Sequence, residues 1–229
     1  MIDTAVILAG GKAKRLKEIT REIPKSLVKF NNKPFLYYQL KLLKKNKIKN
    51  VILCTGHYSS QIENYIKTLK IGINVSISKD GNKLLGTGGA LLKVSKKLKK
   101  NFFLIYGDSY LPTNFQKISK LFKMNSFDIM ISVYKNRNLF DKSNISIKDN
   151  QIIYKKNIKN KNFIYIDYGL CVIGKKAKKY FPKKKVFDLS NLFYNLSKKK
   201  KLSFTIVKER FYEIGSFNGI KDFKKYLKI

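Results

Sequence analysis

The sequence predicts an α/β fold built on a mostly parallel sheet that helices flank. Short apolar runs rich in β-branched and aromatic residues alternate with stretches that carry apolar residues at helical spacing. This alternation is typical of parallel strands joined by crossover helices. Apolar residues make up 44% of the 229 residues, which is enough for one sizeable core. The chain has no internal repeat and no linker rich in Pro, Gly or Ser, so we predict a single domain spanning residues 1–229.

The first part of the chain supplies five of the predicted strands. Each is an apolar run dominated by Val, Ile, Leu or Phe, and they lie at residues 5–8, 50–55, 73–78, 102–106 and 129–134. Between these runs apolar residues recur with a period near 3.6, which predicts helices. The helices are expected to begin near Pro34, Ser60, Gly88 and Asn114. Strand and helix therefore alternate up to the fifth strand.

The later part of the chain carries shorter elements in a less regular order. Strands are expected at residues 145–147, 151–154, 164–173, 204–207 and 211–214. Asp149 and Asn150 separate the first two of these, and such a pair is a turn signal, so we predict a small hairpin inserted in the sheet. Helices are expected at residues 175–180, 189–199 and 219–227.

The net charge is +36, from 50 Lys and Arg residues against 14 Asp and Glu. Such a balance attracts polyanions, so nucleic acid and anionic membrane surfaces are the obvious partners. Only four of the 50 basic residues are arginine, whereas base-edge and bidentate phosphate recognition favour the guanidinium group. The lysines are spread along the whole chain. We interpret the charge as a compositional bias and predict no specific nucleic-acid partner and no membrane partner.

The sequence also bears on the compartment. No apolar run approaches the ~20 residues of a membrane span, and no basic leader precedes the short apolar stretch near the N-terminus, so a cytoplasmic protein is expected. Cys54 and Cys171 each lie inside an apolar run without a second cysteine at metal-binding spacing. We expect both to be reduced core residues.

The first candidate site residues follow the first predicted strand. Gly10 and Gly11 let the backbone approach a ligand closely, and successive N–H groups in such a turn can cradle phosphate oxygens. The pattern is neither G-x-G-x-x-G nor the P-loop, and alone it fits an ordinary turn as well. Arg15 and Lys25 add two cations nearby, and Pro24 stiffens the backbone before Lys25.

These residues, taken in order, resemble the signature of the sugar-1-phosphate nucleotidylyltransferases. The motifs G-G-x-G-T-R-L, P-K-[PS]-[LM] and K-P-[LF] correspond to residues 10–16, 24–27 and 33–35, with further matches at residues 85–91, 106–108 and 213–216. The likeness covers essentially the whole chain. Through residues 165–170 it is most similar to the bacterial branch that handles heptose 1-phosphate or mannose 1-phosphate.

The resemblance implies a Rossmann-like, mixed, mostly parallel sheet of the nucleotide-diphospho-sugar transferase type. It implies transfer of a nucleoside monophosphate from an NTP, with GTP expected, to a sugar 1-phosphate, with Mg²⁺ as cofactor and pyrophosphate as the second product. Such a reaction needs two anions held in line and their charge neutralised. Arg15 is suited to the β- and γ-phosphates, and Lys25 to bridging the attacking and α-phosphates.

Asp108 ends a strongly apolar strand and is the first expected Mg²⁺ ligand, because such a carboxylate lies in the ligand crevice of α/β folds. Glu213 is the second, although it stands where the family usually has Asp. Their alternatives are a helix cap and a surface strand residue. The resemblance further implies nucleotide contacts from Leu8, Gly10, Gly11, Thr87 and Gly88. On the sugar-phosphate side it implies Lys25, Lys156, Asp167 and Tyr168.

Other functions stay open at this point. Ala13 and Lys14 depart from the family motif, and with Glu213 they allow a catalytically silent relative that binds nucleotide sugars. The segments around Lys25 and Lys33 also look like enzymes that transfer a cytidylyl group to a small non-sugar phosphate such as phosphocholine. The high positive charge also leaves a nucleic-acid-binding protein as an alternative. The nucleobase, the sugar and the oligomeric state, a homo-oligomer included, are not determined by these patterns.

Overall fold

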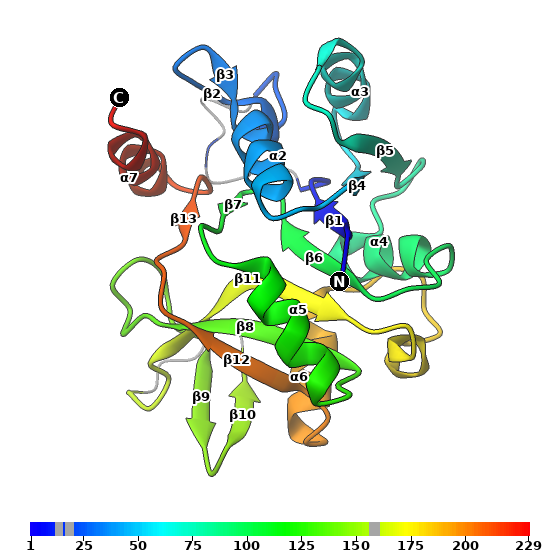
Figure 1. The fold of residues 1–229 in the computed structure, drawn as a ribbon, viewed down its shortest axis with the longest axis vertical. Helices are drawn as coiled ribbons and strands as arrows, with labels where there is room; N and C mark the ends of the chain where they lie inside the picture. The colour runs from blue at the N-terminus through cyan, green and yellow to red at the C-terminus, as the bar shows by residue number, and fades with distance from the viewer. Residues whose placement is uncertain (12–15, 17–20, 156–160) are drawn as a thin grey trace.

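The computed structural model describes residues 1–11, 16, 21–155 and 161–229. In this part of the chain nine strands form one central sheet, and helices cover both of its faces (Figure 1). Along its main path the strand order is β10-β9-β11-β6-β1-β4-β5, and β8 joins β11 to β12. The predicted α/β class, with a mixed and mostly parallel sheet, is confirmed.

The strands of the central sheet agree with the predicted ranges to within a residue or two. They are β1 (Thr4–Leu8), β4 (Asn50–Thr55), β5 (Asn74–Lys79), β6 (Phe102–Tyr106), β8 (Ile129–Lys135), β9 (Ile145–Lys148), β10 (Gln151–Tyr154), β11 (Tyr165–Ile173) and β12 (Ser203–Val207). The strand expected at residues 211–214 lies outside this sheet. Short strands form two further pairs, β2 (Lys29–Phe30) with β3 (Lys33–Pro34) and β7 (Ser109–Tyr110) with β13 (Tyr212–Glu213).

The helices begin close to the expected positions. They are α2 (Phe35–Lys45), α3 (Ser59–Thr68), α4 (Gly86–Ser95), α5 (Phe115–Met124), α6 (Leu189–Lys198) and α7 (Phe217–Leu227), with 3₁₀ turns η2 (Lys25–Leu27) and η3 (Ala177–Tyr180). The segment expected as a helix at residues 175–180 is therefore only a 3₁₀ turn. One core holds apolar residues of α2, α3 and α5 against the sheet, and a second holds those of α4 and α6.

The register of the sheet explains where a ligand can bind. Strand β1 pairs in parallel with both β4 and β6, so that Leu8 lies level with Cys54 on one side and with Tyr106 on the other. The carboxyl ends of these three strands therefore meet at one edge, where open α/β sheets bind their ligands. Strand β11 runs antiparallel to β6 and β8, which makes the sheet mixed.

The predicted hairpin is present as β9 and β10, which project from the edge of the sheet (Figure 1). Asp149 and Asn150 both have positive φ, 49° and 54°, as a tight turn between twisted strands requires. Tyr154 at the end of the hairpin is buried, and its ring packs edge-on against Phe193 of α6 at 5.6 Å. The hairpin is thus anchored to the α4 and α6 face of the sheet.

Two smaller expectations can be compared with the structure. Cys54 and Cys171 are both buried and free, and burial raises the pKa of the Cys54 thiol to about 12. Both are therefore reduced core residues, as expected. Among the helices of the described residues, none has the length and apolarity that a membrane crossing needs.

Candidate active site

A cavity of about 480 Å³ opens at the carboxyl edge of β1, β4 and β6, on the side of α4 and α6. Segments from across the chain converge on it. Its lining residues include Leu8, Gly10, Gly11, Lys25, Asp80, Thr87, Tyr106, Asp108, Asn144, Tyr154 and Asp188. Five of the residues expected from sequence to contact the nucleotide or its phosphates are thus brought together with the expected metal ligand Asp108.

The turn after β1 is packed tightly against both neighbouring strands. A Cβ on Gly10 would lie 3.2 Å from the backbone nitrogen of Gly56, and one on Gly107 would lie 2.6 Å from the carbonyl oxygen of Leu8. Side chains there would push the strand ends apart. Gly11 differs, because a Cβ on it would meet no atom of the described residues within 4 Å. The backbone of this turn is therefore open to the cavity, as its predicted contact with a nucleotide requires.

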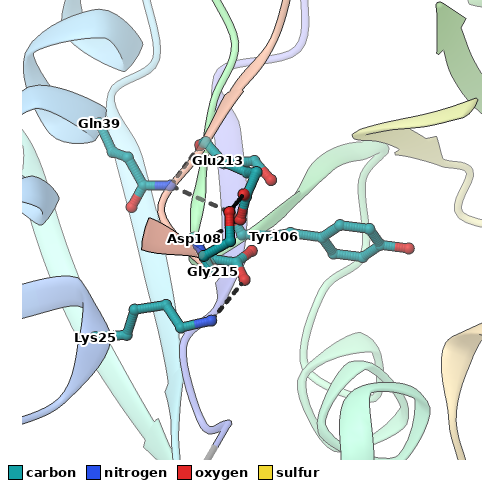
Figure 2. Close-up of polar contacts among 8 residues, drawn as sticks. Lys25, Gln39, Tyr106, Asp108, Glu213 and Gly215 are labelled. Atoms are coloured by element: carbon teal, nitrogen blue, oxygen red, sulfur yellow. Dashed lines mark hydrogen bonds and ion pairs between the residues drawn. The ribbon is translucent and has the colours of Figure 1, made fainter. Parts of the chain in front are cut away.

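Lys25 and Asp108 form an ion pair in the same cavity (Figure 2). Lys25 opens the turn η2, directly after Pro24 in an extended conformation, and Asp108 follows β6. The distance between Lys25 Nζ and Asp108 Oδ2 is 3.0 Å, and the side chains are 18% and 33% exposed. Two residues 83 positions apart therefore place opposite charges on the cavity, partly open to solvent.

Gln39, which the sequence analysis did not single out, supports Asp108. Its buried side chain reaches from α2, and Nε2 donates to the carbonyl oxygens of Tyr106 at 3.1 Å and Ser109 at 2.8 Å. Figure 2 shows this amide beside the turn that carries Asp108. Gln39 fixes the backbone on both sides of the carboxylate. Nothing in the sequence pattern marks it, because it lies within an amphipathic helix.

Glu213 lies next to Asp108 through the backbone. Strand β13 pairs Glu213 with Ser109, and Ile214 N–H donates to the carbonyl oxygen of Asp108 at 2.9 Å. The Glu213 carboxylate, however, accepts hydrogen bonds from Gly215 N–H and the Ser216 hydroxyl at the start of α7. The two expected metal ligands are therefore neighbours, but of the two only Asp108 lines the cavity.

The donor set near Asp108 suits a weakly held hard cation. Within the described residues no group of three or more His, Cys, Asp or Glu side chains could hold a metal ion. Mg²⁺ needs only one or two carboxylates when phosphate oxygens and waters complete its octahedron. Asp108 supplies one such carboxylate, so the residues present fit Mg²⁺ delivered with a triphosphate.

Thr87 and Gly88 have different surroundings. The Thr87 hydroxyl accepts the N–H of Leu189 at 2.9 Å, which ties the start of α4 to the start of α6, and Thr87 lines the cavity. Gly88 packs against Phe187, since a Cβ on it would lie 2.2 Å from the ring, and its N–H donates to the carbonyl of Phe187. Contrary to the expectation, Gly88 provides close packing and is not a cavity residue.

Asp167 and Tyr168 point to opposite faces of β11, because successive residues of a strand alternate. Tyr168 is 1% exposed and packs edge-on against Phe211 in the core on the α2 and α5 side. The expectation that it contacts the sugar is therefore wrong. Asp167 faces the cavity side but lies beneath the surface, where it accepts hydrogen bonds from the hydroxyls of Tyr106 and Tyr154.

Arg15 and Lys156 lie outside the described residues, as do the departures Ala13 and Lys14. Their expected roles stay predictions.

Two acidic residues of the cavity were missed. Asp80 follows β5, its carboxylate accepts the N–H of Leu85 at 3.1 Å, and burial raises its pKa. Asp188 stands just before α6. Asp80 had a usable signal, a carboxylate at a strand end.

Known proteins resemble this chain in sequence and fold. A family model described as nucleotidyl transferase matches residues 4–140. D-glycero-alpha-D-manno-heptose 1-phosphate guanylyltransferase of Campylobacter jejuni is 30% identical over 214 residues, 92% of this chain and 94% of that protein. The protein of the same name from Aneurinibacillus thermoaerophilus is 38% identical over 115 residues, 50% of each chain.

Solved structures share the fold. HddC from Yersinia pseudotuberculosis superposes with a TM-score of 0.82 at 24% identity, covering 99% of this chain and 100% of that one. The inositol-1-phosphate CTP transferase from T. maritima has the same TM-score at 20% identity over 99% and 96%. The sequence match over most of the chain, together with the shared fold, shows that this chain belongs to the nucleotidyl transferase family.

Proposed function

We propose that this enzyme transfers a nucleoside monophosphate from an NTP to a sugar 1-phosphate, releasing pyrophosphate. GTP and a 1-phosphate of the heptose or mannose type are the expected pair. The observation that carries the proposal is the pair of Lys25 and Asp108 beside the open backbone of Gly11 on one cavity. The names of the Campylobacter jejuni and Aneurinibacillus thermoaerophilus relatives support the choice of substrates.

The reaction requires the attacking phosphate oxygen of the acceptor to bond to the α-phosphorus as the bond to the β-phosphate oxygen breaks. The attacking oxygen is already anionic, so no general base is needed. Lys25 lies where its ammonium can leave Asp108 and bridge the attacking and α-phosphates. The backbone N–H groups after β1 are suited to holding the triphosphate. When bound at Asp108, Mg²⁺ would neutralise charge on the phosphate oxygens.

The same proposal covers the compartment and the partners. A chain that consumes NTP works where that substrate is made, so we place it in the cytoplasm. Its partners in this proposal are the NTP and the sugar 1-phosphate, without a specific nucleic acid or a membrane.

The direct test is a matrix of four NTPs against several sugar 1-phosphates and phosphocholine, read out as released pyrophosphate. We expect release with GTP and a heptose or mannose 1-phosphate, in the presence of Mg²⁺. Release only with CTP and phosphocholine would favour the alternative transferase, and no release with any pair would favour the silent relative.

A matched pair of lysine variants tests the mechanism. Lys25→Ala is expected to lower turnover at least ~100-fold, as loss of one well-placed charge contact does. Lys29→Ala changes an exposed lysine of β2 four residues away and is expected to leave turnover unchanged. Equal activity of the two variants would contradict the role given to Lys25.

A further inference from the structure

A buried carboxylate lies behind the end of the cavity that faces the β9–β10 hairpin. Asp167 is 9% exposed, and three donors converge on it. The hydroxyls of Tyr106 and Tyr154 donate to Oδ2 at 2.8 and 3.2 Å, and Gly169 N–H donates to Oδ1 at 2.9 Å. Among the described residues, all three groups that hydrogen-bond to the Asp167 carboxylate are donors, so the carboxylate acts here as an acceptor.

These hydrogen bonds leave the two tyrosine hydroxyls with a fixed polarity. A tyrosine hydroxyl carries a single proton, and here both protons are given to Asp167. Burial raises the pKa of Tyr106 and Tyr154 well above the ordinary value, so both hydroxyls keep that proton. What each hydroxyl can still offer is a lone pair, which accepts a hydrogen bond.

Asn144 lies beside the two tyrosines, and together these three residues form one wall of the cavity. Unlike the tyrosines, Asn144 can offer a hydrogen-bond donor. Its Oδ1 accepts the N–H of Asp167 at 2.9 Å, and within the described residues its Nδ2 makes no hydrogen bond. Tyr106, Tyr154 and Asn144 all line the cavity. They come from three segments that meet at Asp167, whose carboxylate orients the two tyrosine hydroxyls and whose backbone N–H holds the Asn144 amide.

The position of this wall shows which substrate it meets. The ring of Tyr106 extends away from Lys25 and Asp108 (Figure 2), the pair expected to hold the reacting phosphates. The turn implied for the nucleotide follows β1, which lies between β6 and β4, and α4, which carries Thr87, contacts β1 and β4. The hairpin side is therefore the end left for the acceptor.

Resting on the proposed function, we propose that Tyr106 and Tyr154, oriented by Asp167, accept hydrogen bonds from hydroxyl groups of the phosphorylated acceptor. The site thereby selects a polyhydroxylated phosphate. A quaternary ammonium acceptor such as phosphocholine has no hydrogen to donate and would use only the ring faces. Asp167 is a positioning residue in this arrangement and does not touch the substrate.

The test separates the hydroxyls from the rings. In Tyr106→Phe and Tyr154→Phe the ring stays and the hydroxyl is lost. The KM for the sugar 1-phosphate is expected to rise about tenfold in each, the size of one lost neutral hydrogen bond. The KM for the NTP is expected to stay within about twofold. Tyr134→Phe is the matched control, because Tyr134 packs against Phe140 and Phe211 on the other face of the sheet.

Deoxygenated acceptors identify the hydrogen bond itself. With the wild-type enzyme, the KM for one singly deoxygenated sugar 1-phosphate is expected to rise by about the same factor as the KM of Tyr106→Phe for the full sugar. In Tyr106→Phe, the KM for this analogue should be no higher than the KM for the full sugar. If the two increases in KM multiply instead, the hydroxyl of Tyr106 and the missing hydroxyl of the sugar are not in direct contact.

The outcomes distinguish this inference from the function beneath it. Wild-type enzyme that releases no pyrophosphate with any pair overturns both. Active wild type whose tyrosine variants keep the acceptor KM overturns the inference alone, and would leave the network a purely structural one. A preference for phosphocholine that both Phe variants retain also overturns it.

Discussion

Two aspartates serve one cavity, and the protein holds them in opposite ways. Asp108 is a third exposed and faces the ammonium of Lys25. Asp167 is buried and accepts from neutral donors, two tyrosine hydroxyls and a backbone N–H. A partly solvated ion pair is weak and its partners can be exchanged. A buried carboxylate with three donors is expensive to disturb.

The difference matches two tasks that one cavity must perform. At the Asp108 end a cation has to be released to arriving phosphates, so a loose pair is useful. At the Asp167 end hydroxyl groups have to be held in a fixed orientation to select a substrate. We therefore expect substitutions at Asp108 to affect turnover far more than stability, and substitutions at Asp167 to do the reverse.

The largest effect on turnover is expected at Asp108. Asp108→Asn keeps the shape of the side chain but removes the charge, so turnover should fall at least ~100-fold, measured as pyrophosphate release. The free energy of unfolding in urea should change by less than about 1 kcal/mol, because the pair is partly exposed. Asp149→Asn, in the hairpin turn, is the control. A large loss of stability in Asp108→Asn would break the contrast.

The largest effect on stability is expected at Asp167. Asp167→Leu leaves the hydroxyls of Tyr106 and Tyr154 buried without their acceptor. Unfolding in urea should then require about 3 kcal/mol less, since each unpaired buried group costs ~1–3 kcal/mol. The triple variant that also carries Phe at both tyrosines should recover part of the loss. No recovery would mean that the cost arises elsewhere.

The Asp167 region should also make the stability of the fold depend on pH. Burial is the main cause of the raised pKa of Asp167, so the folded state binds this proton more tightly than the unfolded state. Stability is then full below the unfolded pKa of about 4 and declines as the pH rises through the folded pKa. Asp167→Asn should remove this decline. Urea unfolding of both proteins between pH 4 and 7 measures it, and parallel curves would contradict the shift.

The smallest effect on turnover is expected at Gln39, whose side chain hydrogen-bonds to the turn that carries Asp108. Gln39→Leu loses two hydrogen bonds to backbone carbonyls but also removes a buried Oε1 that has no partner among the described residues. The net loss should be about 1 kcal/mol, with turnover reduced about tenfold through misplacement of Asp108. Unchanged turnover would show that Asp108 needs no such support.

The sequence predicted the Asp108 end better than the Asp167 end, for physical reasons. Asp108 follows the end of β6, and parallel strands bring such ends to one edge, while Lys25 lies in a short motif directly after Pro24. The Asp167 network joins residues 13 and 61 positions apart, which follows from the sheet order. The error at Tyr168 was avoidable, since strand alternation excludes both neighbours from one cavity.

Glu213 shows a limit of a different kind. Its place beside Asp108 followed from the motif, but the direction of its carboxylate did not. The side chain reaches the start of α7, where Gly219 leaves room for it, since a Cβ there would lie 2.2 Å from Oε1. Such a choice depends on local packing between segments that no pattern in the chain encodes.

The hairpin of β9 and β10 contributes Tyr154 from the rim of the sheet, joined to the rest by β11 and α6. Its buried residues Ile145, Ile152 and Tyr154 pack in the core with α6, whereas the strands that bear the phosphate-facing residues lie elsewhere in the sheet. A hairpin of equal length that keeps Ile145 and Ile152 but exchanges Tyr154 is therefore expected to change which acceptor is taken, while the transfer chemistry is left intact.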